Sequence, residues 1–258
     1  IHFTEDHSYE ISAGDVFVIE RGFSHGYDDI RDMALYNILF DETLLRQLSF
    51  DLGSMPGYHA IFTMEPKLRL MHAFKSRLKL TGEQLRKCRQ LLAMMSVELQ
   101  NPALEEGSRS LALAYFIELI VYIARVYSQL RLEDTKEIMQ MSDIIAFMET
   151  HIHSQVTIEE LASMAGISAS TLHRLFLKSL GCSPIEYHIQ LKLDHAVRLL
   201  ARTRLSVTEI AESSGFRDSN YFSRQFRKRM GSSPREYRKN ATCRTAGDAK
   251  RECEKTMY

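Results

Sequence analysis

Two stretches in the last third of the chain carry side chains that can read the edges of DNA base pairs. Arg174 and Lys178 stand four residues apart and therefore share one face of a helix. An arginine can donate two hydrogen bonds to guanine, and a lysine can reach guanine or a phosphate. In the second stretch, Asn220 can pair with adenine and Asp218 can accept a hydrogen bond from the amino group of cytosine. These residue types predict contacts to a DNA duplex.

Further polar and basic residues share the outer faces of these stretches. We expect Arg227, Lys228 and Arg229 to contact phosphates, which positions a protein on DNA without specifying a sequence. On an isolated helix such charges more often form only a solvated face, but here they lie on two copies of a repeated unit. The predicted DNA-contacting residues are Ser170, His173, Arg174, Lys178, Asp218, Asn220, Arg224, Arg227 and Lys228.

The two stretches belong to an internal repeat. Residues 176–187 (Phe-Leu-Lys-Ser-Leu-Gly-Cys-Ser-Pro-Ile-Glu-Tyr) recur fifty residues later at 226–237 (Phe-Arg-Lys-Arg-Met-Gly-Ser-Ser-Pro-Arg-Glu-Tyr). Upstream, residues 158–166 match 207–215 at an offset of forty-nine, so the second copy has one extra residue in its turn. Such self-similarity predicts two equivalent structural units.

Each copy has the residues of a helix-turn-helix. We expect Gly166 and Gly215 to turn the chain with a positive φ angle, and Ser168 and Asp218 to cap the helices that follow. The small Ala162 and Ala211 should let the second helix of each copy pack closely across the first. The predicted inner faces consist of Leu161, Ile167, Leu172, Leu175 and Phe176 in the first copy and Ile210, Phe216, Phe222 and Phe226 in the second.

A long helix is predicted to join the two copies. Ser183, Pro184 and Glu186 form a capping box, and Ser233 to Glu236 repeats it. A helix from Pro184 to about Arg202 spans about 28 Å. Because one DNA turn is about 34 Å, this connector predicts two reading helices in successive major grooves on one face of the duplex.

The balance of charge differs between the first part of the chain and the part that contains the repeat. Of its 258 residues, 33 are Lys or Arg and 33 are Asp or Glu, which makes the formal net charge zero. Residues 1–138 hold 15 basic against 20 acidic side chains, whereas residues 139–240 hold 14 against 10. This asymmetry indicates an acidic module joined to one that binds a polyanion.

The first half predicts strands and then helices. Tyr9–Ile11, Val16–Ile19 and Met33–Phe40 are strand-like runs separated by turn residues, which suggests part of a β-barrel or sandwich. From residue 81, leucines recur seven residues apart, and a second apolar stripe follows over 107–131. Two interpretations stay open for these helices: a hairpin that closes its own core, or a dimerisation surface.

We expect a cytoplasmic protein without a membrane partner. The apolar run Leu111–Ala124 is shorter than the about 20 residues that a bilayer needs, so it predicts a buried helix. The four cysteines form no C-x-x-C pair, which fits reduced thiols better than disulfides or a zinc site. No cofactor or bound metal is predicted, and the polar tail 241–258 should be disordered.

Residues 141–239 resemble the AraC/XylS-type family of bacterial transcription factors. The most specific match is Gly215-Phe216-x-Asp218-Ser219-Asn220-Tyr221-Phe222-Ser223-x-x-Phe226, followed by Gly231-x-Ser233-Pro234-x-Glu236-Tyr237-Arg238. The resemblance implies a monomeric unit of two helix-turn-helices that binds asymmetric half-sites, with base contacts from the outer face of each reading helix. Some relatives carry a large aromatic residue where this chain has Ser170, and this departure puts base readout at that position in question.

Many members of that family also carry an N-terminal cupin sensor. Gly14-Asp15-x-x-x-x-Glu20-x-Gly22-x-x-His25 resembles the second cupin motif, with Glu20 in place of the usual proline, whereas His2 and His7 fit the first motif poorly. The resemblance implies a small effector, often a sugar, and makes His25 a candidate effector-binding residue. Residues 36–40 and 57–66 most resemble the rhamnose-operon regulators.

The sequence thus predicts a partial cupin-like β-barrel over 1–80, a helical hairpin over 81–138 that can dimerise, an all-α DNA-binding domain of two helix-turn-helix units over 139–240, and a tail. The predicted function is a DNA-binding regulator, an activator of a carbohydrate-use operon. Its predicted partners are double-stranded DNA, a small effector such as a sugar, RNA polymerase and a second copy of the chain. The alternative is a metal-dependent cupin enzyme fused to a DNA-binding module, which needs a ligand set such as two histidines and a carboxylate.

Overall fold

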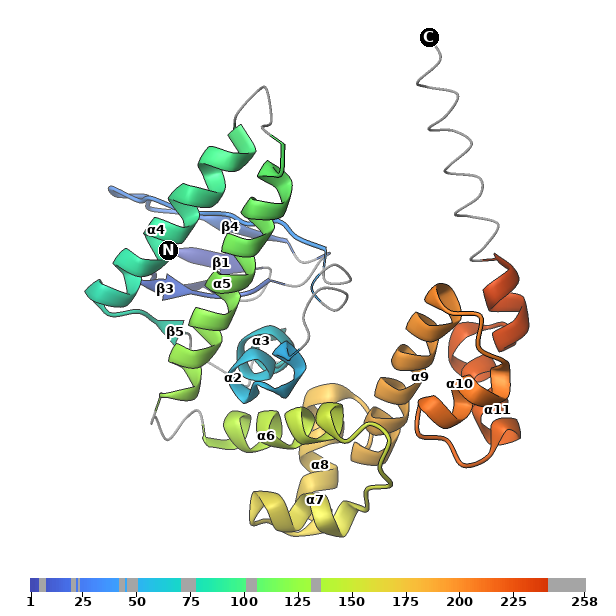
Figure 1. Ribbon diagram of the computed structural model, residues 1–258. Coiled ribbons are helices and arrows are strands. Elements are labelled where there is room, and N and C mark those ends of the chain that lie inside the picture. Colours follow the sequence, from blue (N-terminus) through green and yellow to red (C-terminus); the bar gives the residue numbers. More distant parts are fainter. Residues whose placement is uncertain are drawn as a thin grey trace. The chain divides into compact units, whose positions relative to one another are not determined.

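The chain forms two compact units (Figure 1). The computed structural model describes residues 1–4, 8–19, 22, 24–41, 45, 51–70, 78–100, 106–130 and 136–240. The first unit holds Ile1–Phe147 with Lys178–Leu180, and the second holds Met148–Leu177 and the chain from Gly181 on. The division falls inside α6 (Lys136–Thr150), so the domain boundaries placed at 80, 138 and 240 stay predictions. Outside the described residues lie His7, Glu20, the linker 131–135 and the tail 241–258.

Short strands in two small sheets open the first unit. β1 (His2–Thr4) lies between β2 (Ser8–Tyr9) and β4 (His25–Tyr27), antiparallel to both. β3 (Asp15–Val16) pairs with β5 (Leu78–Lys79), which comes from much later in the chain. The predicted strands at 9–11 and 16–19 are therefore formed only in part, and a cupin-like barrel stays a prediction.

The strand predicted over Met33–Phe40 is not formed. These residues have no ladder partner in the described part of the chain, and Leu39 is 90% exposed. A strand exists only where a neighbour accepts and donates its backbone hydrogen bonds, and an apolar run does not supply that neighbour.

Short helical segments connect the strands to the long helices. They are η1 (Leu52–Ser54), α2 (Pro56–His59), the wider turn η2 (Ala60–Met64) and α3 (Glu65–Leu70). α2 packs so closely on α5 that a Cβ atom at Gly57 would overlap the carbonyl oxygen of Ala124. Tyr127 on α5 donates a buried hydrogen bond of 2.8 Å to the carboxylate of Glu65. These contacts attach the connecting segment to α5.

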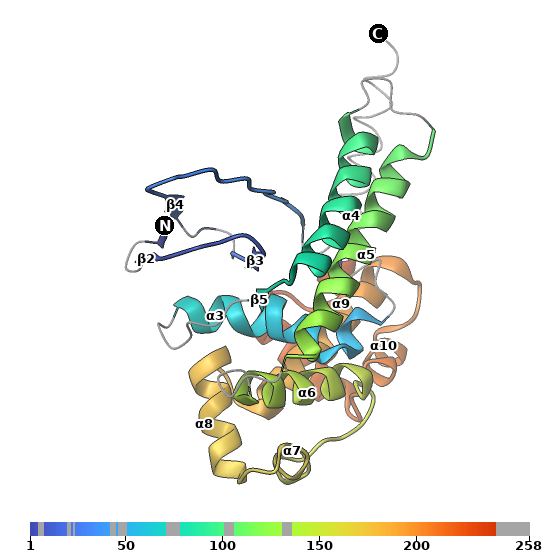
Figure 2. The ribbon, with the colours of Figure 1, turned by 90° about the vertical axis from the view of Figure 1, so that its left-hand side faces the viewer.

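Helices α4 (Gly82–Gln100) and α5 (Ser108–Ser128) lie side by side (Figures 1 and 2). An ion pair of 2.7 Å joins Lys87 on α4 to Glu118 on α5. Cys88, Leu91 and Leu92 of α4 are buried, which favours a hairpin with a core of its own, while a dimerisation surface stays a prediction.

α5 is longer than the apolar run that predicted it. Among the described residues it is the one helix long and apolar enough to cross a membrane, with a mean hydropathy of 1.6 over its most apolar window. Its side chains Phe116, Ile120 and Ala124 instead form part of a core cluster with Leu52 and Tyr58. The prediction of a buried helix thus holds for one face of α5.

The second unit has the predicted pair of helix-turn-helices. α7 (Ile158–Ala165) and α8 (Ala169–Leu180) form the first, and α10 (Val207–Ser213) and α11 (Ser219–Met230) form the second. α9 (Pro184–Arg202) joins them with the predicted bounds, and residues 234–240 form a final helix.

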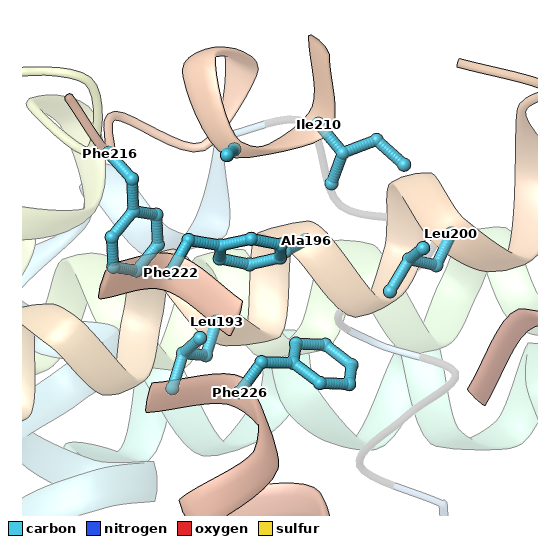
Figure 3. Packing of buried hydrophobic residues seen from close by; sticks show 8 residues of the cluster. Leu193, Ala196, Leu200, Ile210, Phe216, Phe222 and Phe226 are labelled. Atoms are coloured by element: carbon cyan, nitrogen blue, oxygen red, sulfur yellow. The ribbon is translucent and has the colours of Figure 1, made fainter. Parts of the chain in front are cut away.

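A cluster of aromatic rings closes the second helix-turn-helix (Figure 3). The ring centroids of Phe216 and Phe222 are 5.1 Å apart, and those of Phe222 and Phe226 are 5.6 Å apart. The rings pack on Leu193, Ala196 and Leu200 of α9. Stacking and edge contacts of this kind add to the free energy gained by burying the apolar surface.

Both tight turns use a glycine with positive φ, as predicted. Gly166 has φ +66° and Gly215 has φ +75°. Beyond each glycine the next amide donates back into the first helix, from Ile167 to the carbonyl of Ala162 and from Phe216 to that of Ala211. A Cβ atom at Gly166 would meet nothing within 4 Å, whereas one at Gly215 would lie 2.5 Å from the carbonyl oxygen of Ile152.

This difference predicts unequal effects of alanine at the two glycines. Gly166→Ala should lower the free energy of unfolding by about 1–2 kcal/mol, because only the left-handed backbone is strained. Gly215→Ala should lower it by about 3 kcal/mol or more, because the backbone of residues 152–153 must also move. Hydrogen exchange of the α9–α11 amides in the two variants measures both values, and equal losses would contradict the prediction.

Candidate nucleic-acid interface

The first reading helix, α8, is fixed at its start by a side-chain cap. Ser168 accepts a hydrogen bond of 3.2 Å from the amide of Thr171, and its hydroxyl lies 3.0 Å from that of Ser170. Leu172 and Phe176 are fully buried and orient the helix on the core. His173, Arg174 and Lys178 are exposed on the opposite side, as predicted, whereas the Ser170 hydroxyl is already engaged at the cap.

The second reading helix, α11, is oriented in the same way. Phe222 and Phe226 are fully buried, and Asp218 accepts a hydrogen bond of 2.8 Å from the amide of Asn220. Capping occupies one carboxylate oxygen of the exposed Asp218, so the second oxygen remains to accept a bond from a base. The other predicted residues of this helix, Asn220, Arg224, Arg227 and Lys228, are all exposed.

Arg229 has a different role from the phosphate contact that the sequence suggested. Its guanidinium donates to both carboxylate oxygens of Asp194 on α9, at 3.0 and 3.1 Å. Both bonds come from the same nitrogen, Nη2, and hydrogen bonds between charged groups are stronger than those between neutral ones. Arg229 therefore holds α11 on α9. By contrast, Arg227 only approaches Glu236 at 4.0 Å, and its side chain stays 68% exposed.

Charged residues of both reading helices act on Glu186 near the start of α9. Hydrogen bonds from Ser183 are the main cause that lowers the pKa of Glu186, and the charges of Lys228 and His173 lower this pKa further. The carboxylate of Glu186 thus interacts electrostatically with one lysine of α11 and one imidazole of α8.

A buried lysine, which the sequence did not single out, ties the two halves of this unit together. Lys192 on α9 is only 5% exposed, and its ammonium donates hydrogen bonds of 3.0 Å to the carbonyls of Ser154 and Gly215. Burial lowers its pKa, and the nearby charge of Arg217 lowers the pKa further. Gln155 donates 3.1 Å to the same Gly215 carbonyl. The segment before α7 is thereby bound to the turn of the second helix-turn-helix.

Two histidines on α9 are held neutral. Burial lowers the pKa of His188 to about 4, and the charge of Lys192 lowers it as well. Burial and the charge of Arg198 likewise lower the pKa of His195 to about 4. The His195 ring lies edge-on to that of His153 at 5.6 Å between centroids. α9 therefore carries uncharged imidazoles at neutral pH.

The predicted effector residue His25 lies in an aromatic group of the first unit. Its ring centroid is 5.7 Å from that of the buried His2 and 6.1 Å from that of Tyr27. His2 also lies 4.8 Å from the ring of Phe17. Within the described ranges, no group of three or more His, Cys, Asp or Glu side chains is arranged to hold a metal ion.

Two capped reading helices on one scaffold, each with a basic and polar outer face, define a DNA-binding protein of the helix-turn-helix class. Residues 161–240 match the Helix-turn-helix domain family. The chain is 30% identical over 242 residues to the HTH-type transcriptional activator RhaS of Enterobacter sp. (strain 638), covering 92% of this chain and 81% of that protein. RhaS of Shigella sonnei (strain Ss046) is 28% identical over 239 residues, with the same coverage. The chain belongs to the AraC/XylS family of bacterial transcriptional regulators and resembles the RhaS activators.

Solved structures of related regulators are similar to about two fifths of this chain. The DNA-binding domain of AdpA in complex with a target DNA is 33% identical, covers 41% of this chain and 95% of that chain, and gives a TM-score of 0.39. An AraC-type regulator from Chromobacterium violaceum is 30% identical, covers 40% of this chain and 91% of that chain, and gives a TM-score of 0.38.

The neutral histidines predict that acid weakens the second unit. Because the folded-state pKa of His188 is about 4, below the ordinary value of 6.5, the unfolded chain binds more protons between these pH values. Stability should therefore be full above pH 6.5 and fall as the pH drops toward 4, by about 1–2 kcal/mol per imidazole between pH 7 and 5.

Hydrogen exchange of the α9 amides, corrected for intrinsic rates, measures this loss. The variant His188→Leu should show a smaller decrease between pH 7 and 5, because it lacks one of the two imidazoles. A variant with an unchanged pH dependence would contradict the role of His188.

Proposed function

We propose that this chain activates a carbohydrate-use operon by reading two successive major grooves with α8 and α11. The observation that carries the proposal is α9, a helix of 19 residues that joins two capped reading helices. Its length of about 28 Å is close to the about 34 Å of one DNA turn. A rigid connector of this length favours simultaneous contact over contact by one helix at a time.

The exposed residues divide by chemistry between base readout and phosphate contact. Arg174 suits guanine, Asn220 suits adenine, and the second oxygen of Asp218 suits the amino group of cytosine. Arg227 and Lys228 lie in the last turn of α11 and suit phosphates. His173, Lys178 and Arg224 share the exposed faces of the two helices. Ser170 is the weakest member of the set, because its hydroxyl contacts the Ser168 cap.

An effector site in the first unit is the second part of the proposal. Two relatives are named RhaS activators, and the resemblance of residues 36–40 and 57–66 to the rhamnose-operon regulators supports a sugar-responsive regulator. The exposed His25 and the partly exposed Tyr27 place two rings together above the buried His2, and a sugar can contact such rings. Effector binding would favour one DNA-bound arrangement through its different affinity for the two states. RNA polymerase is the partner that an activator requires.

The helical hairpin supplies a candidate dimer surface. Near the α4–α5 turn, Val97 is 69% exposed, Leu99 57% and Leu111 42%. These side chains lie outside the core that the two helices share, so a second copy of the chain can cover them.

The alternative of a metal-dependent enzyme gains no support from the described residues. They contain no group of three or more metal-binding side chains. The relatives are named as transcriptional activators. We therefore favour the regulator.

Selection of bound duplexes from a random library at two salt concentrations tests the proposal. Two enriched blocks about ten base pairs apart are expected if both reading helices contact bases. One block would assign base readout to a single helix. Binding without enrichment that collapses at higher salt would reduce the interaction to phosphate contacts and overturn the proposal.

Single substitutions should separate readout from phosphate contact. Arg174→Ala should cost about 1–3 kcal/mol at the selected site and relax the preference at one base pair, whereas Lys228→Ala should weaken all sequences alike and lower the salt slope by about 1. Titration of matched and mismatched duplexes measures both effects. Lys239→Ala, at an exposed residue outside the two reading helices, is the control. Equal weakening of every sequence by Arg174→Ala would contradict its readout role.

A charge in the hairpin patch should weaken association. Val97→Glu should raise the dimer dissociation constant at least about tenfold, because a desolvated carboxylate would face the partner. Gln100→Glu, at the exposed end of the same helix, adds the same charge as a control. Sedimentation velocity measures both variants, and an unchanged dissociation constant for Val97→Glu would place the dimer surface elsewhere.

A further inference from the structure

One apolar side chain stands out on the DNA-facing surface of α8. Within residues 136–240, all of which the structure describes, the exposed large hydrophobic residues are Met164 at 50% and Leu177 at 46%. Met164 belongs to α7, the helix that does not read DNA. Leu177 belongs to the reading helix itself, and the sequence did not predict a role for it.

Helical geometry places Leu177 in the middle of the reading face. The buried positions of α8 are Leu172, Leu175, Phe176 and Ser179. Leu177 follows Arg174 by three residues and His173 by four, so it lies one turn further along the same exposed face. An apolar side chain thus projects between groups that we assign to base contacts.

The internal repeat shows which residue the second copy has at this place. At the fifty-residue offset, Arg174 corresponds to Arg224 and Lys178 to Lys228, whereas Leu177 corresponds to Arg227. The two reading faces therefore share two cations, and at the place of Leu177 the second copy has an arginine. Arg227 is 68% exposed and suits a phosphate, a contact that a leucine cannot make.

The major groove offers one apolar group, the C5 methyl of thymine. We propose that Leu177 contacts this methyl group in the block of base pairs read by α8 and thereby specifies a thymine there. The inference rests on the proposed function of α8. A single exposed leucine is ordinary on protein surfaces. Here the reason to assign a role is its position between Arg174, His173 and Lys178.

Deoxyuridine tests this contact directly, because it differs from thymidine only by the missing methyl group. The probes are duplexes selected by the whole chain, each with one thymidine replaced by deoxyuridine. Burying one methyl group should change the dissociation constant about three- to fivefold. We expect one position in the α8 block to show this loss with the unsubstituted chain and none with Leu177→Ala. Met164→Ala, a matched exposed apolar residue on α7, should keep the full loss.

Leu177→Arg gives an independent test that does not depend on a truncated side chain. This variant takes the residue of the second copy, so it should bind all duplexes more tightly, steepen the salt dependence by about one phosphate contact and lose the deoxyuridine effect. Retention of that effect in both variants, or its absence from every thymine position with the unsubstituted chain, would overturn the inference.

The same measurements separate this inference from the proposed function. If Arg174→Ala relaxes the preference at its base pair while deoxyuridine has no effect at any position, only the role of Leu177 is wrong. If Arg174→Ala leaves the preference unchanged, α8 does not read bases and both proposals fail.

Discussion

The second unit depends on a buried ammonium group. Lys192 is 5% exposed and donates to the carbonyls of Ser154 and Gly215. A buried charge is costly unless hydrogen bonds replace its hydration, so the two carbonyls must stay close to this side chain. Gly215 can meet that requirement because it has no Cβ atom to collide with residue 152. The lysine thereby fixes the second turn, and with it the start of α11, relative to the connecting helix.

Rigidity is what makes this scaffold suitable for reading DNA. Base edges are recognised only if the side chains arrive in register. Here the Asp218 cap, the aromatic cluster and the Arg229–Asp194 pair together fix the position of α11. α8 is held by Ser168 at its start and by Phe176, whose ring meets that of Tyr187 on α9 at 6.0 Å. The outer faces are not constrained by this packing, and the two copies differ there, for example at the equivalent positions Leu177 and Arg227.

The fold of the first unit could be predicted from its sequence only in part. Its strands are two or three residues long, and β3 pairs with β5, which lies about sixty residues later in the chain. No local pattern encodes such a pairing, because each strand is completed by a neighbour distant in sequence. The same limit explains the missing strand over Met33–Phe40. The α4–α5 hairpin was readable, since a helix satisfies its own backbone and its apolar stripe follows a local period.

The sequence by itself determined the helix-turn-helix pair, the bounds of α9 and the nine exposed residues of the reading faces. These features rest on caps, glycines and helical periodicity, all of which act within a few residues. Further capping boxes at Thr157 and Ser206 followed the same spacing but were not singled out. Only the tertiary structure decided that Arg229 binds Asp194 and that Lys192 is buried. The physical reason is that burial and charge pairing depend on which helices meet in space, and the local sequence around a side chain does not contain that information.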